Sequence, residues 1–152
     1  MKRILTLAVL SFAGAVTTHS QTVTPIWIEG KTGGKGVHSQ FTVINKGITP
    51  LPVTVEPRQL QMVDGKPQFG PVQTGTQVEL KDTSAVIAPK SNRTFDYRVT
   101  CPQDCMVLFM TGFVTGKNKD GVTVKLWIPS SAYLCSETKG CRERTKKAAG
   151  LP

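Results

Sequence analysis

One stretch, from Cys101 to Ile128, constrains the fold of this chain more than any other. It contains an apolar run rich in β-branched and aromatic residues, the polar turn Gly-Lys-Asn-Lys-Asp-Gly, and a second apolar run that ends at Ile128. Two such runs around a turn with Gly, Asn and Asp are the strongest sequence signal for a β-hairpin. Strand side chains alternate between two faces, so the apolar residues at every second position of the second run share one face. These residues are Val122, Val124, Leu126 and Ile128.

The rest of the chain contains further short β-rich runs, separated by Gly, Pro, Asn and Asp. They predict strands over residues 22–28, 38–45, 51–62, 76–80, 84–88 and 93–100, with a loop over residues 68–75. Closely spaced strands, about seven in number and without a segment of helical period, predict an all-β fold, an immunoglobulin-like β-sandwich. A closed barrel is the alternative, which the uneven strand lengths disfavour.

The alternation within these runs also predicts the core of the sandwich. We expect the core to contain Phe41, Val43, Val53, Val55, Phe95, Tyr97, Val99, Leu108 and Met110. The phase of the long run after Cys105 stays open, because a slip of one residue moves every side chain to the other face. The alternative inward set is Val107, Phe109 and Phe113.

The N-terminus has the features of a secretory signal peptide over residues 1–20. Lys2 and Arg3 precede an apolar stretch from Ile4 to Val16, and small residues follow before Gln21. Residues 13–15 offer an earlier cleavage site, and an uncleaved membrane anchor is the alternative. The stretch is shorter than the roughly 20 residues that span a bilayer. We therefore expect a periplasmic or secreted protein with no membrane span after cleavage, and one domain over residues 21–136.

The chain is basic, with a formal net charge of +9 at pH 7. Its densest basic cluster is Arg142, Arg144, Lys146 and Lys147, within residues 137–152, which we expect to form a flexible tail. No aromatic residue is interleaved with this cluster, whereas sites for single-stranded nucleic acid stack bases on aromatic rings. We therefore predict that the tail keeps the protein soluble and that nucleic acid is not a partner.

Four cysteines in the last third of the chain indicate an oxidising compartment. They allow three pairings, and we favour the two local disulfides, Cys101–Cys105 and Cys135–Cys141, because each would hold a turn beside a strand end. A redox pair would have two intervening residues, where Cys101 and Cys105 have three. A zinc site would need neighbouring histidines, and the mature chain contains a single histidine, His38, which lies far from the cysteines in the sequence. We predict no metal site.

Catalytic motifs are absent from the sequence. No serine lies in a nucleophile elbow, and the acidic residues show no paired pattern. The glycine-rich segment 33–36 lacks the full phosphate-loop pattern and precedes a predicted strand, where a phosphate loop would precede a helix. We predict that the protein is not an enzyme and needs no cofactor.

Several short motifs, in this order and spacing, resemble the N-terminal immunoglobulin-like domain of periplasmic pilus-assembly chaperones (PapD-like). They are Phe-Thr-Val-Ile-Asn-Lys-Gly at 41–47, Ala-Val-Ile-Ala-Pro-Lys at 85–90, a proline-led entry into the long apolar run at 102–109, and Lys-Leu-Trp at 125–127. The resemblance covers roughly residues 38–128. Those chaperones have a second β domain, whereas 24 residues follow Ile128 here, so the resemblance is to a single-domain form.

The resemblance implies a function in which the last strand of the domain completes a pilin-like subunit by β-strand addition. It implies Val122, Val124, Leu126 and Ile128 as the residues that fill the partner's groove, and Lys125 as the anchor for a carboxylate of the partner. The alternative is that these residues pack the domain's own core. The protein would then be a secreted immunoglobulin-like structural or adhesive module without chaperone activity. An exposed edge at this strand favours the first hypothesis, and a strand paired on both sides favours the second.

Overall fold

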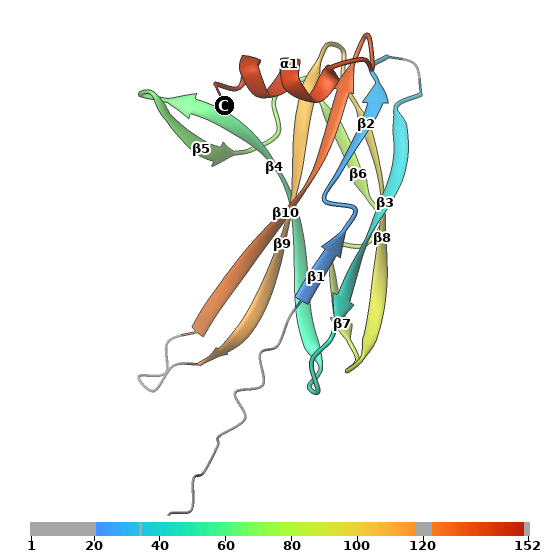
Figure 1. The fold of residues 1–152 in the computed structure, drawn as a ribbon, viewed down its shortest axis with the longest axis vertical. Coiled ribbons are helices and arrows are strands. Elements are labelled where there is room, and N and C mark those ends of the chain that lie inside the picture. The colour runs from blue at the N-terminus through green and yellow to red at the C-terminus, as the bar shows by residue number, and fades with distance from the viewer. Residues whose placement is uncertain (1–20, 34, 118–122, 151–152) are drawn as a thin grey trace, which may run out of the picture.

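The computed structural model describes residues 21–33, 35–117 and 123–150, which form two β-sheets packed face to face (Figure 1). The predicted signal peptide, residues 1–20, lies outside the described residues. This part of the chain contains ten strands and one helix: β1 (Gln21–Thr24), β2 (Trp27–Lys31), β3 (Val37–Asn45), β4 (Leu51–Val63), β5 (Lys66–Gly70), β6 (Gln77–Leu80), β7 (Ser84–Ile87), β8 (Ser91–Thr100), β9 (Cys105–Lys117), β10 (Thr123–Cys135) and α1 (Cys141–Ala148). The predicted all-β immunoglobulin-like sandwich is confirmed, with more strands than expected.

The first sheet has the strand order β1-β3-β8-β6, and the second has the order β2-β10-β9-β4-β5, with β7 also paired to β4. All pairings are antiparallel except that of β2 with β10. The strand predicted over residues 22–28 is divided at Pro25, so that β1 joins the first sheet and β2 joins the second. Proline lacks the N–H that a ladder hydrogen bond needs, which explains the break.

The core between the sheets is built around aromatic rings. Phe41 and Phe95 stack with their ring centroids 5.4 Å apart, and the centroids of Tyr97 and Phe109 are 4.1 Å apart. The predicted core residues from β3, β4 and β8 are all buried here: Phe41, Val43, Val53, Val55, Phe95, Tyr97 and Val99.

The predicted phase of β9 is wrong. Val107, Phe109 and Phe113 face the core between the sheets, whereas Leu108 and Met110 lie on the outer face of the second sheet. Both faces of this strand are apolar because the outer face is covered as well. Its buried cluster consists of Met106, Leu108, Met110, Tyr133, Cys135 and Cys141. Hydrophobicity alone therefore does not distinguish the two phases.

The segment 137–152, expected to be a flexible tail, instead contains helix α1. Its residues Cys141 and Thr145 are buried against the outer face of the second sheet. The helix follows Gly140, whose positive φ of 67° suits glycine. The segment expected to be a loop over residues 68–75 also differs, because β5 reaches Gly70 and forms a hairpin with β4. The Asp64-Gly65 turn of this hairpin has positive φ at both residues, as a tight hairpin turn requires.

Candidate functional site at the edge of strand β10

Strand β10 and its partner β9 form a long hairpin that leaves the body of the sandwich (Figure 1). Their antiparallel register runs from Thr123 opposite Lys117 to Leu134 opposite Cys105. The register is interrupted by an irregularity between Val124 and Lys125. The hairpin predicted from the sequence is therefore present.

The opposite edge of β10 is only partly paired. Strand β2 pairs with Ser131–Cys135, so residues 123–130 have no strand on this side within the part of the chain that the structure describes. This unpaired stretch of β10 ends at Ser130 and Ser131, where Pro25 and Ile26, between β1 and β2, contact the strand. There the Ser130 hydroxyl donates to the Pro25 carbonyl at 2.8 Å, and the Ser131 N–H donates to the Ile26 carbonyl at 2.9 Å. An unpaired strand edge is a template for pairing with another chain.

The hydrogen bond of Ser131 shows which backbone groups the free edge offers. Successive residues of a strand direct their N–H and C=O groups to opposite sides, and those of Ser131 point toward β2. The N–H and C=O of Trp127 therefore point to the free side, together with the carbonyl of Pro129. Pro129 has no N–H, so it offers an acceptor alone.

The side chains of this stretch divide between two faces as the alternation predicts. Leu126 and Ile128 lie opposite Phe113 and Thr111 of β9, on the face that turns toward the sandwich core. Leu126 is 47% exposed, whereas Ile128 is partly buried against the core. Two apolar side chains thus accompany the free edge, one of them largely open to solvent.

The other three predicted site residues are Val122, Val124 and Lys125, and the structure describes the side chain of Lys125 alone among them. Val122 lies outside the described residues, and Val124 is described by its backbone, which pairs with Gly116. Lys125 lies on the other face of β10, where its Nζ is 4.0 Å from the centroid of the Trp127 ring. Such a contact between an ammonium group and an indole ring is attractive and holds the lysine side chain in place.

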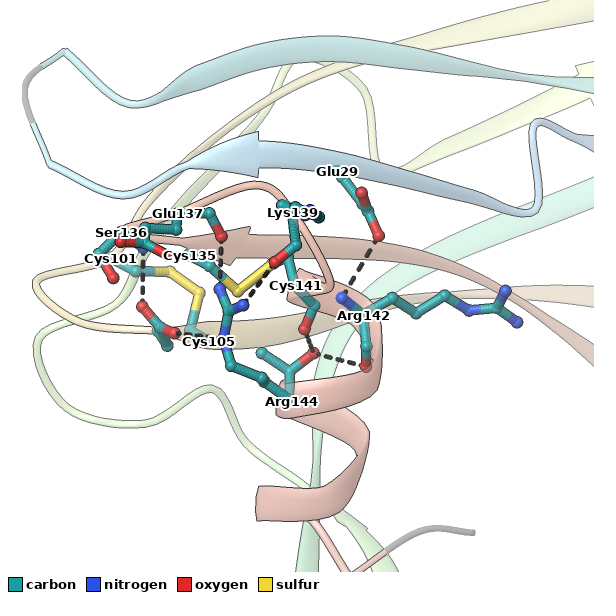
Figure 2. The surroundings of a disulfide bond; sticks show 12 residues. Glu29, Cys101, Cys105, Cys135, Ser136, Glu137, Lys139, Cys141, Arg142 and Arg144 are labelled. Atoms are coloured by element: carbon teal, nitrogen blue, oxygen red, sulfur yellow. Dashed lines mark hydrogen bonds and ion pairs between the residues drawn. A yellow bond between two sulfur atoms is a disulfide. The ribbon is translucent and has the colours of Figure 1, made fainter.

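Two disulfides lie where β9 begins and β10 ends (Figure 2). The structure confirms the two local pairings, Cys101–Cys105 and Cys135–Cys141. The first links the end of β8 to the start of β9, and the second links the end of β10 to the start of α1. Disulfides of this kind are stable in an oxidising compartment.

The contacts that hold α1 were not anticipated from the sequence. The Arg144 guanidinium donates to the carbonyls of Glu137 and Lys139 and lies 3.9 Å from the Asp104 carboxylate (Figure 2). The guanidinium of Arg142 lies 4.8 Å from the ring centroid of Trp27. The available signal was the run Cys-Arg-Glu-Arg-Thr-Lys-Lys-Ala after Gly140, because Arg, Glu, Lys and Ala all favour helix. These basic residues anchor the helix to the sheet rather than forming a flexible tail.

The described residues offer neither a cluster of metal ligands nor a helix that could span a membrane. They contain no group of three or more His, Cys, Asp or Glu side chains that could hold a metal ion. No helix in the same ranges is long and apolar enough to cross a membrane. In the core, burial raises the pKa of Tyr97, and a hydrogen bond with Ser39 opposes this effect.

Comparison with solved structures finds this fold in proteins of different kinds. The class 5 fimbriae chaperone CfaA gives a TM-score of 0.58 at 9% identity, over 78% of this chain and 57% of the chaperone. The CsuC-CsuE chaperone–tip adhesion subunit complex from Csu pili of Acinetobacter baumannii gives 0.56 at 14% identity, over 86% of this chain and 65% of the matched chain. WR4, an MSP family member of C. elegans, gives 0.54 at 9% identity, over 78% of this chain and 100% of its own.

At these identities the comparisons show a shared fold. The chain spans less than two thirds of the two matched chains from the fimbrial and pilus proteins. No protein-family model and no curated protein sequence matches this chain. The structure is therefore an immunoglobulin-like sandwich of the kind found both in pilus chaperones and in MSP proteins.

Proposed function

We propose that this protein binds an extended segment of a protein partner by β-strand addition to the free edge of β10. It would act as a periplasmic or secreted, non-enzymatic accessory protein of surface-fibre assembly, and its partner would be a pilin-like or other fibre subunit. The observation that carries this proposal is the backbone edge of residues 123–130, which pairs with no strand in the described part of the chain and lies beside an exposed Leu126. The two disulfides support a location in an oxidising compartment.

The geometry of the edge supports this mode of binding. A segment laid beside β10 would receive a hydrogen bond from the Trp127 N–H and donate to the carbonyls of Trp127 and Pro129. Main-chain bonds of this kind supply affinity, while alternate side chains in apolar surroundings supply specificity. Leu126 and Ile128 would supply that apolar surface, extended by Val122 and Val124 toward the hairpin turn. Lys125 would meet a carboxylate of the segment on the other face.

A second function is favoured by two contacts within the chain. Ile128 packs partly against the domain's own core, and Lys125 is already in contact with Trp127. Both contacts fit a structural or adhesive module in which β10 completes the sandwich and binds no added strand. The two functions differ in whether a strand of another protein pairs with the free edge of β10.

Titration with a synthetic peptide tests the proposal directly. The probe is an extended peptide of alternating valine and threonine with a free C-terminal carboxylate, and the measurement is amide hydrogen exchange at Trp127. We expect the peptide to protect this N–H. The same peptide with N-methylated backbone groups should not protect it, because it cannot form the ladder.

Two matched variants separate the site from the fold. Leu126→Asp should weaken peptide binding by about tenfold or more, because a charge would enter an apolar contact without a counter-ion. Val86→Asp is the control, since Val86 is also a strand residue and is 71% exposed on β7. Equal peptide binding by both variants and the wild type, or binding that N-methylation leaves unchanged, would favour the structural module.

A further inference from the structure

A second apolar surface lies on the outer face of the second sheet, on the opposite side of β10 from Leu126 and Ile128. It is a cleft of about 370 Å³ lined by Glu56, Arg58, Phe69, Met110 and Trp127. These residues come from β4, β5, β9 and β10, and the cleft lies between the β4–β5 hairpin and the β9–β10 hairpin, which diverge in Figure 1. Aromatic residues, Met and Arg are the side chains enriched in protein interfaces.

Trp127 is seated in this cleft by a glycine on the neighbouring strand. Gly112 lies opposite Trp127, and a Cβ at residue 112 would be 2.6 Å from Lys125 Cε and 2.8 Å from Trp127 Cζ3. A side chain at this position would therefore displace both residues. Glycine weakens a strand interior, and here it lets the indole ring and the lysine stem lie on the backbone of β9. The apolar wall of the cleft is consequently preformed.

Phe69 forms the opposite wall and is 57% exposed. Met62, at the end of β4 and on the same face of the hairpin as Phe69, is also an exposed large apolar residue. The β4–β5 hairpin thus presents apolar side chains that the domain itself does not cover. Exposed large apolar side chains beside an apolar cleft are typical of a surface that another molecule covers.

The charges around the cleft indicate the chemistry of its occupant. Glu56 and Arg58 form an ion pair at 2.7 Å, so their charges compensate each other. Lys125 lies over the Trp127 ring and has no carboxylate within ion-pair distance among the described residues. Among the described residues, the charge beside the apolar wall that lacks an ion-pair partner is therefore positive. A ligand that complements this surface combines an apolar side chain with a neighbouring anionic group.

We propose that this cleft binds an aromatic or large aliphatic side chain of a protein partner that is flanked by acidic residues. The apolar side chain enters between Phe69, Met110 and Trp127, and a flanking carboxylate lies near Lys125. This site goes beyond the proposed strand addition, because it uses side chains on the outer face of the sheet and needs no ladder with β10.

The test uses Trp127 as a fluorescent reporter. The chain contains two tryptophans, so Trp27→Phe leaves Trp127 as the single one. The probes are acetylated and amidated pentapeptides with a central phenylalanine flanked by Glu, Ser or Lys. They carry no terminal carboxylate and are too short to form an extended ladder. We expect saturable binding of the Glu-flanked peptide, about tenfold tighter than that of the Ser-flanked peptide, and weaker at higher salt.

Two substitutions of exposed residues decide the assignment. Phe69→Ala should weaken binding of the Glu-flanked peptide by about tenfold, as expected for an aromatic interface residue. Ile48→Ala, at a position 66% exposed outside the cleft, should leave binding unchanged. The proposal is overturned if no peptide gives a saturable change or if both substitutions act equally. It is also overturned if phosphatidylglycerol vesicles bind through Phe69 while the peptides do not, since the surface would then meet a lipid headgroup.

Discussion

Replacing Phe109 with alanine tests the corrected phase of strand β9, and with it the whole arrangement of the core. Phe109 is fully buried at the centre of the second sheet, opposite Pro57 of β4 and Ser130 of β10. Its ring centroid is 4.1 Å from that of Tyr97 and 5.8 Å from that of Phe41, both in the first sheet. The substitution would therefore open a cavity between the two sheets.

The expected loss of unfolding free energy is large. A buried Phe→Ala substitution costs about 3–5 kcal/mol. Contacts between aromatic rings add about 0.5–1.5 kcal/mol beyond the area that they bury. We therefore expect a loss near the upper end of that range, which is a considerable part of the roughly 5–15 kcal/mol that stabilises a typical domain. For a domain of this size the melting temperature should fall by roughly 15 °C.

Urea denaturation with the disulfides intact measures this loss, through the shift of the midpoint at an unchanged slope. Val114→Ala is the matched control, because Val114 lies on the same strand but is exposed. It should change the free energy of unfolding by no more than about 0.5 kcal/mol. A loss below about 1 kcal/mol for Phe109→Ala would refute the assigned phase, since such a small value is typical of an exposed site.

Three further predictions concern other parts of the sandwich. Asn45→Ala should lower the free energy of unfolding, measured by urea denaturation, by about 1–3 kcal/mol. The amide of the buried Asn45 donates to the carbonyls of Thr49, Ile87 and Ala88, and these carbonyls would lose their donor. Replacing Cys135 and Cys141 together with serine should cost about 2 kcal/mol, since the loop that they close is short, and should speed amide hydrogen exchange in α1 with little change in β8. Stability should also fall above roughly pH 10: burial raises the pKa of Tyr97 in the folded protein, so the unfolded chain releases this proton first. Tyr97→Phe should reduce that alkaline loss in a urea titration across pH, and an equal loss in the variant would contradict the assignment.

Local sequence patterns determined much of the fold. The alternation in the runs that became β3, β4 and β8 placed Phe41, Val53 and Phe95 correctly in the core, because one face of each strand is apolar and the other is not. The hairpin of β9 and β10 followed from two apolar runs around a Gly- and Asp-containing turn. The two local disulfides were favoured among the three possible pairings because each holds a turn beside a strand end, and the structure contains both. Each of these features depends on residues close together along the chain.

Features that depend on neighbours far apart in sequence were decided by the tertiary structure alone. The phase of β9 was ambiguous because α1 and side chains of β4 and β10 pack on its outer face, so that Leu108 is buried as well as Phe109. The free edge of β10 exists because β2 begins pairing at Ser131, more than a hundred residues away along the chain. The alternation of Leu126 and Ile128 indicates a shared face, but it carries no information about whether the strand's other edge is paired. Pairing is a property of the assembled sheet, since its backbone hydrogen bonds are the same for any side chain.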